Sequence, residues 1–235
     1  MKPKLTGQKS HIGRYWDKHL MSWESGAYPE DEIVHSAGLW DRLSSLFRKD
    51  RVAQRMDALM DLLTPYIPGM SILDIGCASG RLAVKLIKQG ASHVTGIDVA
   101  SSAIEIAERR GKKEGMESNL DFFEADVTLP DIELPQVDIV TALGVIEYFD
   151  RQSLDNFLSN LKAKHFLFHV PLTKEKGKGK VSFLRRIYLI FNRCPGVYLY
   201  TLEEFTEIAG RHGYTDLRVI KKFATFITNL PEKAT

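Results

Sequence analysis

Two alternating patterns of apolar residues run along the chain between residues 50 and 170. Nearly continuous apolar runs, such as VDIVTAL and HFLFHV, predict buried strands. Apolar residues at helical spacing predict helices between these runs. The predicted strands are 71–75, 93–98, 120–124, 137–143 and 165–170, and the predicted helices are 50–63, 81–89, 101–110 and 153–161. Strands that alternate with helices favour parallel crossovers, so we expect an α/β fold with helices on both faces of the sheet.

The pattern changes after Pro171. The stretch LTKEKGKGK predicts a cationic loop, and SFLRRIYLIFNR predicts a basic amphipathic helix. A last helix is expected over 202–212, followed by strands at 217–223 and 225–228. Since no helix separates these two strands, they should pair antiparallel.

The expected fold is therefore a Rossmann-like α/β sheet of seven strands, mostly parallel, with an antiparallel last strand. We expect an aromatic-rich N-terminal segment over 1–49 and one domain over 50–235. Within that domain, an insertion covers about 172–200. At 235 residues and 44% hydrophobic content, the chain is long enough for one substantial core.

Charge and cysteine content narrow the class of protein. The formal net charge of +2 gives no overall excess that would attract nucleic acid. Two cysteines are too few for a disulfide framework and are typical of a reducing compartment. The start of the sequence has no apolar region of the signal-peptide kind, and no uncharged apolar run is long enough to span a membrane. We therefore expect a cytoplasmic protein.

The stretch LDIGCASGRLA places two glycines where the first strand turns into a helix. Gly76 and Gly80, with Ala78 between them, do not match the G-x-G-x-x-G spacing of dinucleotide sites. Asp74 precedes the turn, and its carboxylate would repel a pyrophosphate but suits a cationic ligand. Asp98 ends the next strand, where it can accept hydrogen bonds from a ribose diol. The alternatives are an ordinary strand-to-helix turn for the glycines and a helix N-cap for Asp98.

These motifs resemble those of class I S-adenosylmethionine-dependent methyltransferases. LDIGCASGRLA and VTGIDVA look like the first and second motifs of the family. The resemblance continues through FFEADV and VDIVTALGVIEYFD and covers residues 50–170; YTLEEFTEIAGRHGY looks like the final helix. Ala78 takes the place of the family's middle glycine. The resemblance implies S-adenosylmethionine as the cofactor and methyl transfer as the reaction.

The resemblance also implies which residues bind the cofactor. Asp74 and the glycine loop would surround the methionine moiety, Asp98 would hold the ribose, and Asp126 would meet the adenine amine. The implied residues are Asp74, Gly76, Cys77, Ala78, Gly80, Asp98, Val99, Asp126, Val127 and Leu143. An Asx turn is the alternative for Asp126, and a buried small hydrophobe is the alternative for Cys77.

Candidate catalytic residues follow the fourth and fifth strands. Methyl transfer depends mainly on the alignment of nucleophile, methyl group and sulfur, and a base contributes where the nucleophile is an alcohol. Glu147 and Tyr148 follow the fourth strand, and His169 ends the fifth. A core histidine is the alternative for His169.

The acceptor is predicted from the N-terminal aromatics and the basic insertion. Arg14, Tyr15 and Trp16 would cover the site, or form a helix that packs on the sheet. Arg185 and Arg186, with the lysines before them, favour an anionic acceptor or an anionic membrane surface, or belong to a solvated linker. We expect O-methylation of a small molecule or glycan, without a metal.

Three other interpretations remain open. A nucleic-acid or protein methyltransferase shares the cofactor motifs, although LGVIEYF lacks the [DNS]-P-P-[YF] tetrad of amino-methylating DNA enzymes. The second interpretation is a binding protein that has lost catalytic activity. The presence of Asp74 and Asp98 argues against it, because an inactive site has no need of these acids. An NAD-dependent dehydrogenase is disfavoured by the glycine spacing.

Overall fold

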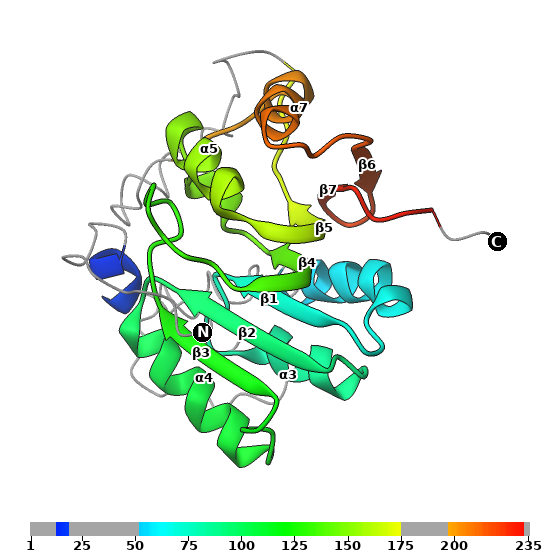
Figure 1. The fold of residues 1–235 in the computed structure, drawn as a ribbon. Coiled ribbons are helices and arrows are strands. Elements are labelled where there is room, and N and C mark those ends of the chain that lie inside the picture. Colours follow the sequence, from blue (N-terminus) through cyan, green and yellow to red (C-terminus); the bar gives the residue numbers. More distant parts are fainter. Residues whose placement is uncertain (1–12, 19–51, 175–196, 233–235) are drawn as a thin grey trace, which may run out of the picture.

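The computed structural model describes residues 13–18, 52–174 and 197–232, which form a single seven-stranded sheet covered by helices (Figure 1). The strand order is β3-β2-β1-β4-β5-β7-β6. The first five strands pair in parallel, and β7 is antiparallel to both β5 and β6. The strands are β1 (Ser71–Ile75), β2 (His93–Asp98), β3 (Leu120–Glu124), β4 (Gln136–Ala142), β5 (Lys162–His169), β6 (Arg218–Lys221) and β7 (Thr225–Thr228). The fold class predicted from the sequence is confirmed.

Helices cover both faces of the sheet because apolar side chains point alternately to either face of each buried strand. Helix 52–63, which continues into the 3₁₀ turn η1 (Thr64–Tyr66), covers one face with α3 (Arg81–Lys88) and α4 (Ser101–Lys113). The other face is covered by α5 (Arg151–Asn160) and α7 (Leu202–Arg211). Along β5, Leu167 joins the first core, while Phe166 and Phe168 join the second.

Several elements start or end away from the predicted positions. Helix α4 continues past 110 to Lys113, since its Gly111 is buried against the sheet. Helix α5 begins at Arg151 because Asp150 accepts a hydrogen bond from the Ser153 nitrogen at 2.8 Å, the contact of an N-cap. Strand β5 begins at Lys162, three residues before the predicted start at 165. These differences lie at element ends and leave the topology unchanged.

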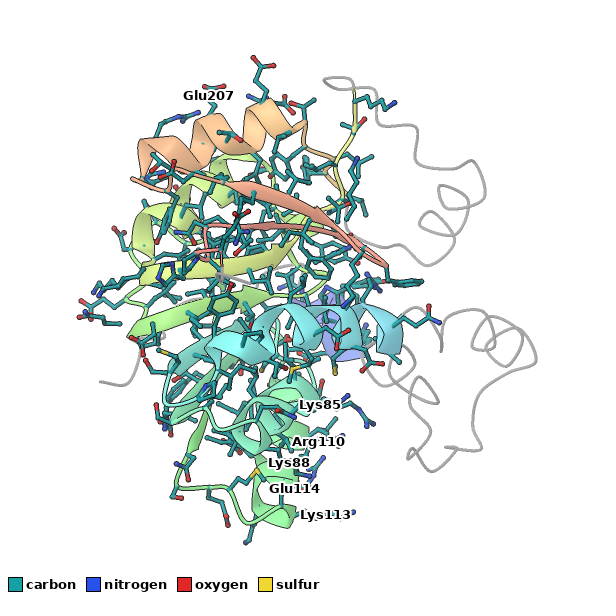
Figure 2. All side chains as sticks on the ribbon, turned by 90° about the vertical axis from the view of Figure 1, so that its right-hand side faces the viewer. Lys85, Lys88, Arg110, Lys113, Glu114 and Glu207 are labelled. Atoms are coloured by element: carbon teal, nitrogen blue, oxygen red, sulfur yellow. The ribbon has the colours of Figure 1, made fainter. Side chains whose placement is uncertain are left out.

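Charged side chains lie on the outer surfaces of the helices (Figure 2). Lys88 on α3 and Glu114 after α4 form an ion pair of 2.7 Å at one end of the molecule, while Glu207 on α7 lies at the opposite end. None of the helices that the structure describes is both long and apolar enough to cross a membrane. The predicted basic helix 182–193 and most of segment 1–49 lie outside the described residues.

Candidate functional site

Two adjoining cavities open at the carboxyl ends of the central strands, which is where open α/β sheets bind ligands. The larger has a volume of about 200 Å³ and the smaller about 100 Å³. Both are lined by Val52, Arg55, Gly76, Ala78 and Leu143. The larger cavity is also lined by Trp16, Ile75, Ile97, Asp98, Val99, Ala125, Asp126, Val127, Thr128, Gly144, Val145, Glu147, Tyr148 and Phe149. The smaller one is completed by Met56, Asp74, Cys77, Arg81 and Leu82.

The loop between β1 and α3 forms the wall that the two cavities share. Gly76 has a φ of +68°, and a Cβ atom built on it would lie 2.1 Å from Val145 Cγ2, so only glycine fits there. Ala78 adopts a φ of +49°, in the left-handed region that favours glycine. Gly80, with a φ of +74°, lies outside both cavity linings and lets α3 approach Ala107 and Phe122.

Asp74 is the most deeply buried acid of the site, with 2% of its surface exposed. Its Oδ1 accepts a hydrogen bond from Thr141 Oγ1 at 3.1 Å, whereas its Oδ2 has no hydrogen-bond partner among the described residues. Burial raises the pKa of Asp74 to about 7, the Thr141 hydroxyl lowers it and the nearby Asp98 raises it further. A buried oxygen of this kind, beside a cavity, is suited to a cationic ligand.

Asp98 binds the glycine loop as well as facing the larger cavity. Its Oδ2 accepts a hydrogen bond from the Ala78 nitrogen at 3.0 Å, and its Oδ1 accepts one from the Ala100 nitrogen at 3.0 Å. Asp98 also lines the larger cavity, so one residue contacts both the loop and the cavity. The N-cap position of α4 belongs to Ala100 and not to Asp98.

Asp126 forms the expected Asx turn and also lines the larger cavity. Its Oδ1 accepts hydrogen bonds from the Thr128 nitrogen at 3.0 Å and from Thr128 Oγ1 at 2.6 Å. Val99 and Val127 line the same cavity. The Asx turn, which was the alternative for Asp126, is present, and contact of this residue with an adenine amine stays a prediction.

The 3₁₀ turn η2 (Ile146–Tyr148) follows β4 and contributes three consecutive lining residues, Glu147, Tyr148 and Phe149. A distant segment supports this turn: the Tyr198 nitrogen donates to the Glu147 carbonyl at 2.7 Å, and Tyr200 Oη donates to the Phe149 carbonyl at 2.6 Å. Glu147 is buried, with 6% of its surface exposed. The turn thus presents a buried carboxylate beside two aromatic rings.

The short helix 13–18 closes the larger cavity from the side of α4. Trp16 lines the cavity and contacts Tyr148 edge to face, with ring centroids 5.5 Å apart. Asp17 Oδ1 accepts a hydrogen bond from the Ser102 nitrogen at 3.2 Å, which supplies α4 with the side-chain cap that Ala100 lacks. The helix is therefore fixed at two points, η2 and the start of α4.

Other predicted site residues lie in different environments. Cys77 is buried and lines the smaller cavity, and Tyr15 is buried outside both linings. Arg14 is exposed on the N-terminal helix. His169 is buried against Phe226, with ring centroids 6.0 Å apart, and lies outside both linings. Arg185 and Arg186 lie outside the described residues.

Two arginines that were not predicted line the site. Arg55 borders both cavities and Arg81, at the first position of α3, borders the smaller one, although only 9% of its surface is exposed. The sequence contains one signal for Arg55, which lies one helical turn after the apolar Val52 in the predicted helix 50–63. A cation among the apolar positions of that helix indicates a site beside them. No comparable pattern identifies Arg81.

Sequence comparison identifies the central part of the chain as a methyltransferase domain. The profile of a methyltransferase domain family matches residues 72–164. The chain is 28% identical to mouse EEF1A lysine methyltransferase 2 over 145 residues, covering 62% of this chain and 53% of that protein. It is 31% identical to a ubiquinone biosynthesis O-methyltransferase of Albidiferax ferrireducens over 144 residues, covering 59% of this chain and 56% of that protein. The chain thus spans about half the length of these relatives.

Structural comparison extends the likeness to nearly the whole chain. The magnesium protoporphyrin IX methyltransferase of Synechocystis PCC 6803, solved with bound S-adenosylhomocysteine, superposes with a TM-score of 0.65 at 18% identity, covering 94% of this chain and 96% of that one. The geranyl diphosphate C-methyltransferase of Streptomyces coelicolor gives a TM-score of 0.60 at 16% identity, and the alignment covers 93% of this chain and 82% of that one. At these identities the likeness establishes the fold. The chain thus has the Rossmann-like fold of class I S-adenosylmethionine-dependent methyltransferases, and its residues 72–164 match a methyltransferase domain family.

Proposed function

We propose that this protein transfers the methyl group of S-adenosylmethionine to a hydroxyl group of a small-molecule acceptor. The observation that carries the proposal is the placement of three carboxylates, Asp74, Asp98 and Asp126, around two adjoining cavities. Asp98 ends β2, Asp74 is the penultimate residue of the neighbouring parallel strand β1, and Asp126 follows β3 on the other side of β2.

The residues present fit the cofactor from end to end. In the smaller cavity, Asp74 Oδ2, which has no hydrogen-bond partner among the described residues, would bind an ammonium group. Arg55 and Arg81, which border the same cavity, would bind a carboxylate. In the larger cavity, the Asp98 carboxylate would accept hydrogen bonds from the ribose hydroxyls. Asp126 would accept from the adenine amine, between the apolar walls formed by Val99 and Val127.

When bound, S-adenosylmethionine supplies an electrophilic methyl carbon on a sulfonium. That carbon would be open to attack by an acceptor oxygen, with the neutral thioether as the leaving group. The hydroxyl proton passes to the Glu147 carboxylate. Trp16, Tyr148 and Phe149 keep water out of the larger cavity, and their apolar surfaces strengthen the electrostatic contacts within it.

Glu147 is a better candidate base than His169. A general base must come within hydrogen-bond reach of the proton that it removes. Glu147 lines the larger cavity, whereas His169 lies on the sheet face covered by helix 52–63, against Phe226. The Glu147 backbone is also held in place by Tyr198.

An anionic acceptor is supported by the position of the basic insertion in the sequence. Leu172 and Tyr200 form a parallel bridge, and the Thr173 nitrogen donates to the Tyr200 carbonyl at 2.8 Å. The chain therefore leaves and re-enters the described fold close to Glu147. The intervening sequence, 175–196, carries Lys176, Lys178, Lys180 and the Arg185–Arg186 pair. Relatives whose names specify ubiquinone biosynthesis and magnesium protoporphyrin IX also support a small-molecule acceptor.

A second candidate function is methylation of an amine. A buried carboxylate next to an edge-to-face pair of aromatic rings is a suitable environment for an alkylammonium group. Glu147 lies beside Tyr148, which contacts Trp16. The relative named as a lysine methyltransferase matches this chemistry.

An acceptor assay with radiolabelled S-adenosylmethionine tests both candidates. We expect the full-length protein to label hydroxylated anionic compounds in preference to lysine or arginine peptides. Glu147→Gln should lower the turnover rate by about a hundredfold while S-adenosylhomocysteine binds as before. Glu207→Gln, an exposed change on α7 (Figure 2), is the matched control and should leave turnover unchanged. Labelling of peptides alone would replace the first candidate with the second.

A further inference from the structure

Asp74 and Thr141 are paired directly across the two central strands of the sheet, β1 and β4. Both side chains are buried, with 2% and 0% of their surfaces exposed. The Thr141 hydroxyl donates to Asp74 Oδ1 at 3.1 Å, and the other oxygen, Oδ2, has no hydrogen-bond partner in the part of the chain that the structure describes. Asp74 lines the smaller cavity, and Thr141 lies behind it, outside that lining.

We propose that Thr141 is a positioning residue: it fixes one oxygen of Asp74 so that the other captures the ligand's ammonium group, and it sets the pH range over which the buried Asp74 does so. The inference rests on the proposed function, because the ammonium group belongs to the methionine moiety of the cofactor. It adds a residue that does not touch the ligand and a pH dependence that follows from the burial of Asp74.

A valine at position 141 would fill nearly the same volume, so Thr141→Val removes the hydroxyl and leaves the packing nearly unchanged. Without that hydrogen bond, neither oxygen of Asp74 would have a fixed donor inside the sheet. The carboxyl group would then turn about its χ2 angle and would also accept a proton more readily. Both changes weaken an interaction with an ammonium group.

The direction of the pH dependence follows from the groups that face Asp74. These are Thr141 on β4, Asp98 on β2, and the cationic Arg55 and Arg81 that border the same cavity. Burial raises the pKa of Asp74 to about 7, and the Thr141 hydroxyl lowers it. An ammonium group binds the ionised carboxylate, so affinity should rise between pH 6 and pH 8. Loss of the Thr141 hydroxyl raises the pKa further and moves this rise to higher pH.

Titration calorimetry with two ligands tests the proposal on the full-length protein. S-adenosylhomocysteine carries the amino-acid end, and 5′-methylthioadenosine lacks it. We expect Thr141→Val to lower the affinity for S-adenosylhomocysteine about tenfold at pH 7. The affinity for methylthioadenosine should stay within about twofold of that of the unaltered protein. The rise in affinity with pH should shift upward in this variant, and Thr141→Ser should restore both properties.

Thr228→Val is the matched control, since it removes another buried hydroxyl, which donates to the Phe166 carbonyl on β5. This variant should lower the stability of the fold and leave the affinities for S-adenosylhomocysteine and methylthioadenosine unchanged. Equal weakening of both ligands by Thr141→Val, or an unchanged affinity for S-adenosylhomocysteine, would overturn the positioning role. If the unaltered protein binds neither ligand, the proposed function fails and this inference fails with it.

Discussion

The Asp98 carboxylate holds the Ala78 nitrogen at 3.0 Å, although Ala78 adopts a φ of +49° that alanine rarely occupies. A left-handed alanine costs roughly 1–2 kcal/mol, and a charge-assisted hydrogen bond offsets a cost of that size. The acid expected to hold the ribose therefore also holds the loop that lines both cavities. Binding and local structure depend on the same side chain.

Asp98→Ala should abolish cofactor binding and also lower the free energy of unfolding. The variant loses hydrogen bonds from two backbone nitrogens, at Ala78 and Ala100, for an expected cost of about 2–3 kcal/mol. Asp126→Ala is the comparison, because the Asp126 bonds stay within its own turn. Urea unfolding and calorimetry measure the two effects, and unchanged affinity in Asp98→Ala would refute the ribose role.

Asp74→Asn should make the protein more stable at neutral and alkaline pH. The folded pKa of about 7 lies above the ordinary value of 3.8, so the native state of the unaltered protein loses stability as pH rises from about 4 to 7. With 1.36 kcal/mol for each pKa unit, the loss reaches at most about 4 kcal/mol.

Asparagine carries no charge to bury, so the variant should gain stability above pH 7 and lose the gain near pH 4. Urea unfolding across this pH range measures the difference. The same variant should bind S-adenosylhomocysteine more weakly, because the ammonium partner is gone. A stability difference that does not change with pH would contradict the raised pKa.

Gly76→Ala should destabilise the fold more than Gly115→Ala does. Both glycines have a φ of +68°, but a Cβ on Gly76 would lie 2.1 Å from Val145 Cγ2, whereas nothing lies within 4 Å of one on Gly115. The matched pair separates backbone strain, roughly 1 kcal/mol, from steric overlap, which adds about 1–3 kcal/mol. Equal losses of unfolding free energy in the two variants would show that Val145 moves to accommodate the added Cβ atom.

Asp17→Ala should release the N-terminal helix from α4. Loss of a side-chain cap costs about 1 kcal/mol of unfolding free energy. Because Trp16 on the same helix lines the larger cavity, S-adenosylhomocysteine should also dissociate faster in stopped-flow measurements. Lys18→Ala, an exposed change on the same helix, serves as the control. An unchanged dissociation rate in Asp17→Ala would mean that the helix does not retain the ligand.

The sequence predicted the strands and the acids at their ends because both depend on local pattern. A buried parallel strand must be apolar throughout, and the residue at its carboxyl end, such as Asp74 or Asp98, meets the ligand edge in any fold of this class. The strand-to-helix turn at Gly76 could be predicted for the same reason. These features follow from a few neighbouring residues.

Other features of the site depend on contacts between residues distant in sequence, which no local pattern encodes. Asp17 caps a helix that starts 84 residues later at Ser101, and Tyr200 holds a carbonyl 51 residues away at Phe149. His169 lies at the expected strand end, but strand alternation turns it towards Phe226 and away from the cavities. Arg55 joins the site because helix 52–63 begins at the ligand edge of the sheet.

Titration calorimetry with S-adenosylmethionine and S-adenosylhomocysteine, with NAD as the control, tests whether the two cavities bind the methyl donor. We expect saturable binding of S-adenosylmethionine and S-adenosylhomocysteine in the micromolar range and none of NAD, since Asp74 would repel a pyrophosphate. Binding of NAD without S-adenosylhomocysteine would contradict the assignment of both cavities.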